Sequence, residues 1–207
     1  MTNRVMGMGH GKAAAIFTFA LGIGFASAVL AGESETEKQA LQKCEIDICR
    51  MITDKSRDGA DLTCQLSKTW QQEDIEKGAQ EKKLTWGFGR ARCNVAVDVK
   101  RADIVDAVTK PEYTLKIEKQ PVDCEIERNE EKYPIKLTLA PVLQFKDGKA
   151  TEAQLGVDNI EGTTLIKGVV WTAATLEQNF GLFQSDIVRE VNKFIERQCP
   201  KRLASGG

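Results

Sequence analysis

The sequence predicts an α+β domain: a curved antiparallel meander of four to five strands, packed by N-terminal and C-terminal helices and stabilised by disulfides. Three observations favour this fold class. Stretches near both ends of the domain place apolar residues at spacings of three and four, as amphipathic helices do. The stretches between them alternate apolar and polar residues, as half-buried strands do. Two of these alternating stretches change phase midway, which indicates a strongly curved sheet.

Residues 1–32 have the pattern of a cleaved export signal, so the expected domain covers residues 33–207. Two basic residues precede an apolar stretch over 13–30, and small residues stand before two candidate cleavage points, after Ala28 and after Ala31. A transmembrane anchor is the alternative, because the stretch approaches the length of a membrane span. The clustered small residues favour cleavage, and the absence of a twin arginine favours the general secretory route.

The first predicted helix covers residues 35–54 and the first predicted strand covers residues 62–70. The apolar face of the helix contains Leu41, Cys44, Ile48, Met51 and Ile52. The apolar face of the strand also carries Lys68, two positions before Trp70. A lysine near a strand end can extend its stem along apolar surface and keep its ammonium in water, so this placement alone does not require a ligand.

A polar connection with a short helix over 74–79 leads to a strand predicted over 84–99. The apolar phase of this strand changes at Gly87–Gly89, where a bulge or a bend would restore the pattern. A short amphipathic helix follows over 101–109, and Pro111 ends it.

The next strand, predicted over 113–127, changes phase at Pro121, which fits a kink. A further strand over 133–145 alternates throughout, Asp147–Gly148 predicts a hairpin turn, and residues 153–157 continue the meander. The pattern loosens after Gly162. The last predicted helix spans 186–198, with Ser185 as its N-cap and Pro200 as its end.

All six cysteines follow the predicted signal, and an even number of cysteines in an exported chain is typical of disulfides. No Cys-x-x-Cys pair is present, which argues against a zinc module and a thioredoxin-like site. We expect a bridge between Cys93 and Cys124, since both fall at inward positions of successive strands. The other four, which could tie the two terminal helices to each other and to the first strand, are Cys44, Cys49, Cys64 and Cys199.

Histidine is confined to His10, inside the predicted signal. The mature chain therefore lacks the residue of Ser-His-Asp and Cys-His hydrolases and of the usual zinc and iron sites. No nucleophile motif or phosphate loop is present either, so we predict no catalytic residue, no metal and no cofactor. Two carboxylates would suffice for a glycosidase, which keeps a carboxylate-dependent hydrolase as the least favoured alternative.

The charge balance argues against a nucleic-acid partner. Without Arg4 and Lys12, 27 of the 29 basic residues remain against 30 acidic ones, and the charges are interspersed. Nucleic-acid-binding domains instead carry a basic stripe on a basic surface.

Aromatic residues at or near predicted strand ends and bends are the candidates for a ligand site. Their ordinary role is core packing. The functional alternative is an aromatic-lined pocket inside the curved sheet, with Lys68 as an inward polar group and Arg90 and Arg92 at its mouth. The candidate ligand-binding residues are Lys68, Trp70, Trp86, Phe88, Arg90 and Trp171.

The run Lys68-Thr69-Trp70, followed by LTWGFGRARC from Leu84 to Cys93, resembles uncharacterised exported proteins of alphaproteobacteria over the central half of the chain. The resemblance implies a periplasmic setting and transfers no active site. We therefore expect a periplasmic, non-enzymatic binding protein for an apolar or amphipathic, lipid-like ligand. The alternative is an envelope protein-interaction module acting as an inhibitor, chaperone or scaffold.

Overall fold

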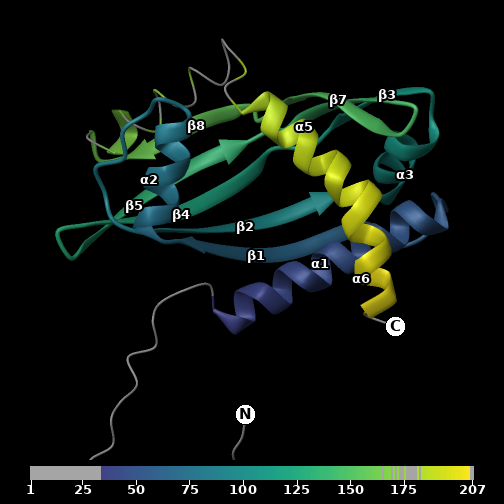
Figure 1. Cartoon of the computed structure of the whole chain (residues 1–207), viewed down its shortest axis with the longest axis horizontal. Helices are drawn as coiled ribbons and strands as arrows, with labels where there is room; N and C mark the ends of the chain where they lie inside the picture. Colours follow the sequence, from purple (N-terminus) through teal and green to yellow (C-terminus); the bar gives the residue numbers. More distant parts are fainter. Residues whose placement is uncertain are drawn as a thin grey trace, which may run out of the picture. The chain divides into compact units, whose positions relative to one another are not determined.

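The computed structural model describes residues 34–164, 166–168, 170, 172, 175, 181 and 183–205. In this part of the chain helices pack against antiparallel strands, so the predicted α+β class is confirmed (Figure 1). The export signal predicted over residues 1–32 lies outside the described residues.

The bounds of α1, β1 and α3 coincide with those predicted from periodicity, and α2 is longer than its prediction at both ends. In chain order the labelled elements are α1 (Glu35–Asp54), β1 (Leu62–Trp70), α2 (Gln72–Glu81), β2 (Ala91–Val99), α3 (Arg101–Thr109), β3 (Glu112–Lys116), β4 (Gln120–Arg128), β5 (Glu131–Leu139), β6 (Val142–Lys146), β7 (Lys149–Gln154), β8 (Val157–Gly162), α5 (Gln184–Lys193), η1 (Phe194–Gln198) and α6 (Cys199–Ser205).

The strands form a five-stranded sheet in the order β1-β2-β4-β5-β8 and a three-stranded sheet in the order β3-β6-β7. The chain passes between these sheets four times: once through α3, from β2 to β3, and three times directly, from β3 to β4, from β5 to β6 and from β7 to β8. Backbone hydrogen bonds join the crossing points, since Ile117 donates to Pro141 (2.9 Å) and Ala140 donates to Gly156 (3.0 Å). The two sheets are therefore one meander that bends sharply along a common line.

The prediction that two stretches each form one continuous strand is wrong. Residues 113–127 and 133–145 were each expected as one strand, but each is divided between the two sheets. The phase change near Pro121 marks the first direct crossing. The second direct crossing, at Ala140–Pro141, leaves the alternation undisturbed, so hydrophobic pattern alone could not show it.

The strand predicted over 84–99 begins only at Ala91. At the glycines, Glu127 accepts a hydrogen bond from the Gly89 N–H (2.7 Å) and donates one to the Arg90 carbonyl (2.9 Å). Glu127 therefore lies opposite two residues, which is the arrangement of a β-bulge. The segment before it is not a strand. It brings Trp86 and Phe88 together with ring centroids 5.1 Å apart.

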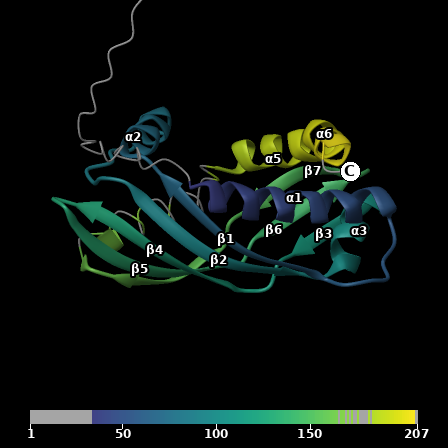
Figure 2. The same ribbon diagram turned by 90° about the horizontal axis from the view of Figure 1, so that it is seen from below.

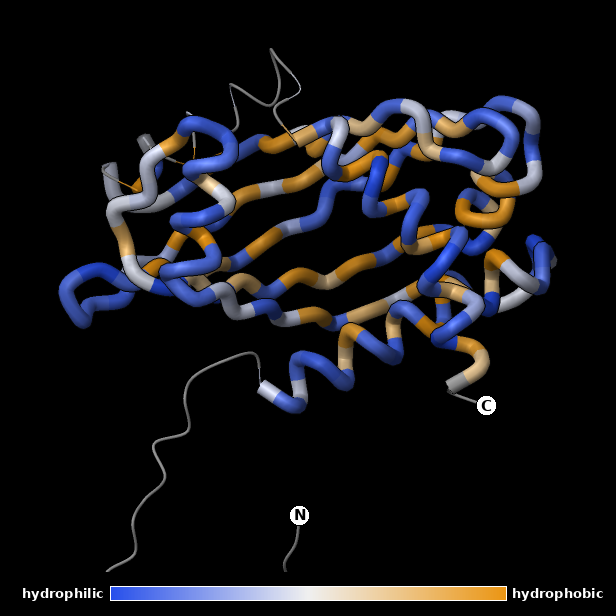
Figure 3. Tube along the Cα trace, in the orientation of Figure 1, coloured by the Kyte–Doolittle hydropathy of each residue, from blue (hydrophilic) through white to orange (hydrophobic). Residues whose placement is uncertain are grey.

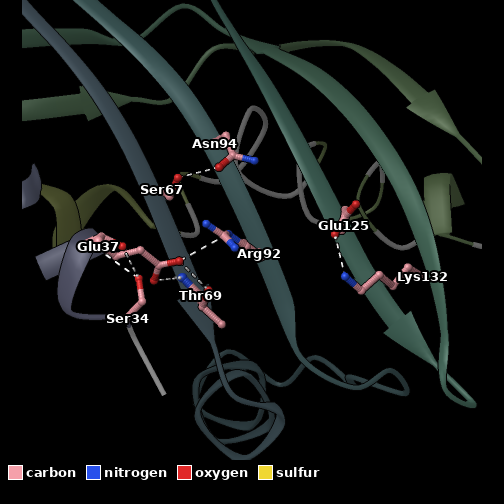
Figure 4. A network of polar contacts seen from close by, with 9 residues as sticks. Ser34, Glu37, Ser67, Thr69, Arg92, Asn94, Glu125 and Lys132 are labelled. Atoms are coloured by element: carbon pink, nitrogen blue, oxygen red, sulfur yellow. Dashed lines mark hydrogen bonds and ion pairs between the residues drawn. The ribbon is translucent and has the colours of Figure 1, made fainter. Parts of the chain in front are cut away.

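Hydrophobic and hydrophilic residues alternate along the strands of the five-stranded sheet (Figure 3), and buried and exposed positions alternate with them, as in β4. Residues of β2, β4 and β5 form the main core on the concave face, including Ala91, Ile126 and Ile135. Polar pairs cross the strands on the other face, for example Ser67 with Asn94 (2.6 Å) and Lys132 with Glu125 (3.3 Å) (Figure 4). This separation of polar from apolar side chains is typical of an antiparallel sheet with one solvent-exposed face.

The terminal helices lie on the concave side, where the strands curve beneath α1, α5 and α6 (Figure 2). Buried Cys44 and Met51 of α1 pack with Leu62 of β1. The apolar stripe of α5 packs on the three-stranded sheet through Ile187, Val188 and Val191. These helices cover the β1 edge and the three-stranded sheet, while Ile166 and Val170, from the residues after β8, pack on the core of the larger sheet.

Two side chains also cover free strand edges. Glu37 of α1 accepts hydrogen bonds from the Thr69 N–H (3.2 Å) and hydroxyl (2.9 Å) on the β1 edge, and pairs with Arg92 (3.3 Å) (Figure 4). Asn192 of α5 accepts from the Ala150 N–H (2.8 Å) and donates to its carbonyl (2.9 Å) on the β7 edge. Both contacts satisfy backbone groups that an edge strand otherwise leaves open.

The C-terminal helical region differs from its prediction at both ends. Its helix begins at Gln184 after Phe183, so Ser185 lies inside the helix and is not the N-cap. Helical structure also continues past Pro200 to Ser205, through the π-helical turn η1. Proline clashes with the carbonyl four residues earlier in a regular α-helix, and the wider turn before Pro200 relieves that conflict.

The predicted disulfide framework is confirmed, and no cysteine is free. Cys93 and Cys124 bridge directly paired positions of β2 and β4. The other four cysteines join α1 to β1 and α1 to α6, through the pairs Cys44–Cys64 and Cys49–Cys199.

Candidate ligand-binding site

A cavity of about 440 Å³ lies over the concave face of the five-stranded sheet. Of the fifteen described residues that line it, thirteen are apolar and two, Ser67 and Lys68, are polar; the Ser67 hydroxyl itself is bonded to Asn94 on the other face. The apolar lining residues are Leu41, Leu66, Trp70, Cys93, Val95, Val122, Cys124, Leu137, Leu139, Leu155, Val157, Val170 and Phe183.

Side chains aligned across the strands form the floor of the cavity. Strand register places one residue from each of β1, β2, β4 and β5 in a first row. This row contains Leu66, Val95, Val122 and Leu137. The pairing of Leu139 with Val157 extends the floor onto β8. The cavity therefore runs across the strands, from one edge of the sheet to the other.

A second row lies beside the first. In it Lys68 of β1 is paired with Cys93 of β2, and Cys93 with Cys124 of β4. The bridge between these two cysteines lies in the floor and links the two strands at its centre. The charged residue of the described lining, Lys68, is thus at the β1 end of the floor.

Three residues from other parts of the chain complete the described lining. Leu41 comes from α1, Val170 comes from the helical residues that follow β8, and Phe183 immediately precedes α5. The ring of Phe183 lies 5.8 Å from the ammonium of Lys82, which also forms an ion pair with Asp186 of α5. The end of α2 is thereby linked to the start of α5 beside the cavity.

Lys68 and Trp70 are the predicted ligand-site residues that line the cavity. The Lys68 residue is half-buried, and Trp70 is 39% exposed, an unusual value for a large apolar side chain. Trp70 ends β1, lines the cavity and remains partly accessible to solvent. A tryptophan ring suits such a boundary, since it combines apolar area with a polar N–H group.

The other predicted residues have different places. Phe88 is buried in the main core with Trp86 packed on it, and the Trp86 indole N–H donates to the Gly89 carbonyl (2.9 Å). Arg90 pairs with Glu127 (2.6 Å) beside the bulge, and neither arginine at the expected mouth is a lining residue. Trp171 lies outside the described residues.

Sequence reasoning missed the aliphatic floor as a site. The inward positions of β2, β4 and β5 were correctly identified from alternation, but alternation does not distinguish a packed core from the floor of a cavity. Leu41 and Phe183 could not be selected from the sequence, because only the packing of α1 and the segment before α5 brings them to the sheet.

Buried acids elsewhere in the described chain are paired with cations or hydrogen-bond donors. Glu37, 3% exposed, has the partners on β1 and β2 given above. Asp106 pairs with Arg57 (3.3 Å) and Lys110 (2.8 Å). A hydrogen bond from Tyr113 to Asp103 (2.6 Å) raises the pKa of that tyrosine to about 12. The described residues contain no cluster of acids and cysteines suited to a metal ion.

Comparison with known protein families, curated proteins and solved structures finds no match for this chain. Within its described part, no helix combines the length and apolar character needed to cross a membrane.

Proposed function

We propose that this protein is a periplasmic, non-enzymatic binding protein that holds an apolar or amphipathic, lipid-like molecule in the cavity over its five-stranded sheet. The observation that carries the proposal is the cavity itself, about 440 Å³ with thirteen apolar residues among fifteen in its described lining. Protein interiors are normally close-packed, and ligand sites are typically apolar hollows of about 300–1,000 Å³ with few polar groups.

The disulfides of the described chain support an extracytoplasmic location. Three disulfides fit an oxidising, extracytoplasmic environment. The signal pattern over residues 1–32 and the resemblance to exported alphaproteobacterial proteins support export to the periplasm specifically.

The cavity favours binding over the two alternatives. The described part of its lining contains no carboxylate and so supplies no acid pair for a glycosidase. A protein-interaction module would be expected to show an apolar patch or an open strand edge. Among the described residues Trp70 is the exposed large apolar side chain, and Glu37 and Asn192 cover positions on the β1 and β7 edges; β3 and β8 are the other two edge strands.

A cavity-filling substitution tests the proposal. Val122 is buried at the centre of the floor, so the ring of Val122→Phe would occupy the space that a ligand needs. We expect delipidated Val122→Phe to bind the neutral fluorescent probe N-phenylnaphthylamine at least about tenfold more weakly than the unchanged protein, a loss of about 1.4 kcal/mol. Fluorescence titration measures this difference.

The matched control is Asp123→Phe, which adds the same ring to the next residue of β4. Its side chain belongs to the polar outer face, so probe binding should stay unchanged. Equal binding by all three proteins, or no binding by the unchanged protein, would reject the cavity as the site. Native mass spectrometry of protein purified from its own envelope should also find a bound lipid-like molecule.

A further inference from the structure

We infer that the ligand in this cavity is a single unbranched hydrocarbon chain of about fifteen carbons, extended across the strands from β1 to β8. The inference rests on the proposed function and specifies the shape and size of its ligand, without assigning a head group. It follows from the outline of the cavity floor, from the volume above it and from the aliphatic side chains that line it.

The floor is long across the strands and narrow along them. Each of the middle strands contributes two successive inward residues: Cys93 and Val95 of β2, Val122 and Cys124 of β4, and Leu137 and Leu139 of β5. Such residues are about 6.7 Å apart along a strand, so the floor is two side chains wide. Across the strands, from β1 to β8, it covers four intervals of about 4.8 Å, roughly 19 Å in all (Figure 1). One extended chain fits this long and narrow outline.

The length and the volume of the cavity give the same capacity. A carbon chain with ordinary bond lengths and angles advances about 1.25 Å per bond, so about fifteen bonds cover a floor of roughly 19 Å. A methylene group is about as large as a water molecule, whose share of liquid volume is about 30 Å³. The cavity of about 440 Å³ therefore holds about fifteen such groups. A lipid with two chains of this length would need about twice that volume.

The described lining is mainly aliphatic. Nine of its thirteen apolar residues are leucine or valine, and the β8 end is formed by Leu155 and Val157. The aromatic residues of the described lining, Trp70 and Phe183, lie outside the three middle strands. Leucine and valine side chains gain dispersion energy from each methylene group they touch, but they offer no flat surface for stacking a ring. Such a floor suits a flexible chain better than a planar ring system.

A series of neutral primary alcohols tests the length of the ligand. Hexanol, octanol, decanol, dodecanol and tetradecanol would each be used to displace bound N-phenylnaphthylamine from delipidated protein, below their solubility limits. We expect the affinity to rise about fourfold for each added methylene group through the whole series, because each one buries further apolar surface. An affinity that stops rising at octanol would reject a chain that covers the whole floor.

Cyclododecanol tests the shape of the ligand. It has the same number of carbons as dodecanol, but its ring places two stretches of chain side by side. A floor two side chains wide should accept the open chain and not the ring, so we expect dodecanol to bind at least about tenfold more tightly. Equal affinities would reject the extended chain.

A substitution at the β8 end tests the direction of the chain. The ring of Val157→Phe would fill the last strand interval of the floor, about 4.8 Å or roughly four carbon–carbon bonds. Tetradecanol should bind Val157→Phe at least about tenfold more weakly than the unchanged protein, while octanol should bind both equally. Unchanged octanol binding also establishes that the variant is folded. Equal losses for both alcohols would contradict a chain that extends to β8.

The matched control is Asp158→Phe, which adds the same ring to the next residue of β8. The Asp158 side chain is exposed and pairs with Lys119 (3.2 Å), so this variant should bind every alcohol as the unchanged protein does. A loss of tetradecanol binding equal to that of Val157→Phe would reject the assignment of the β8 end.

The outcomes separate the two proposals. If N-phenylnaphthylamine binds and Val122→Phe weakens it, but ring and chain bind alike, the single extended chain is rejected while the proposed cavity function stands. If neither the alcohols nor N-phenylnaphthylamine bind, the proposed function itself is rejected.

Discussion

At the scale of single residues, Lys68 shows how one lysine can serve both roles that its sequence position suggests. Its stem lies on the apolar face of β1 and its residue lines the cavity, but it is only half-buried near the end of the strand. Strand register places the residue at the β1 end of the cavity floor, two positions before the partly exposed Trp70. Snorkelling and ligand binding are therefore compatible.

Glu37 illustrates a charged residue whose role only its neighbours reveal. A glutamate three residues after an N-cap serine would ordinarily turn back to the cap. Here the Ser34 hydroxyl accepts the Glu37 N–H (3.2 Å), while the Glu37 carboxylate bonds to β1 and Arg92. The carboxylate thereby holds the start of α1 on the sheet edge.

The pKa of Tyr113 provides a residue-scale prediction. Its hydrogen bond to Asp103, assisted by burial, raises the pKa from 10.0 to about 12. Because the folded-state pKa is raised, this stabilisation is complete below pH 10.0 and is lost as the pH rises through about 12. The chain contains two tyrosines, so the Tyr133→Phe variant retains only Tyr113. Near-ultraviolet absorbance of this variant should show tyrosinate forming near pH 12.

The comparison for this titration is Asp103→Asn in the same background. Asparagine keeps an oxygen that accepts a hydrogen bond but removes the negative charge that makes this bond strong, so the Tyr113 pKa should move back toward 10.0. A titration that is the same with and without Asp103 would contradict the assignment.

At the scale of elements, the bend line is the feature that shapes the protein. Three successive strand pairs cross from one sheet to the other, and the crossings are tied together by backbone hydrogen bonds. The sheet can bend there because Pro141 lacks an N–H group and Gly156 has a positive φ of 60°. The hairpin beyond the bend is equally specific, since Asp147 (φ 49°) and Gly148 (φ 75°) both adopt the conformation of a type I′ turn.

Gly156 tests the importance of this line. A Cβ atom at position 156 would lie 2.3 Å from the Ala140 carbonyl oxygen, so Gly156→Ala must displace the backbone of the crossing. We expect Gly156→Ala to lower the free energy of unfolding by about 2 kcal/mol or more, from strain and from the weakened Ala140 hydrogen bond. Guanidinium denaturation measures the loss.

Gly78→Ala is the control for Gly156→Ala. Gly78 lies within α2, and a Cβ atom there meets nothing within 4 Å. The substitution should leave stability unchanged or raise it by up to about 1 kcal/mol, since alanine is the better helix residue. Equal effects of the two substitutions would mean that the bend tolerates a side chain.

At the scale of the whole molecule, the disulfides connect the layers that enclose the cavity. One bridge holds α1 on β1, another holds α1 to α6, and the third lies in the cavity floor. An ion pair between Arg202 and Glu45 (2.7 Å) adds a second link between α6 and α1. The two terminal helices are therefore fixed over the concave side, where they bound the space above the sheet.

The disulfide whose cysteines are farthest apart in the sequence should stabilise the protein most. Cys49 and Cys199 are 150 residues apart, whereas Cys93 and Cys124 are 31 apart. If restriction of the unfolded chain dominates, removing the first pair costs about 5 kcal/mol and removing the second about 4 kcal/mol. Denaturation midpoints of the two double alanine variants under non-reducing conditions measure the order. A larger loss from the Cys93–Cys124 pair would mean that native packing around the cavity outweighs chain entropy.

Local pattern was sufficient for α1, β1, α3 and the Asp147–Gly148 turn, because helix periodicity, strand alternation and turn chemistry involve residues close in sequence. Inward positions on successive strands also predicted the Cys93–Cys124 bridge, whereas the pairing of the other four cysteines was left open. Local pattern failed where Pro141 divides an unbroken alternation and where Pro200 continues a helix through a wide turn.

The sequence by itself determined which side chains face the concave side, because alternation assigns a face to each residue of a strand. Only the tertiary structure decided that Val95, Val122 and Leu137 line a cavity, although Val122 belongs to the same buried cluster as Ile126 and Ile135, which do not line it. The physical reason is that a cavity depends on the distance between the sheet and the segments above it. That distance is set by contacts between residues such as Cys49 and Cys199, which are far apart in the chain.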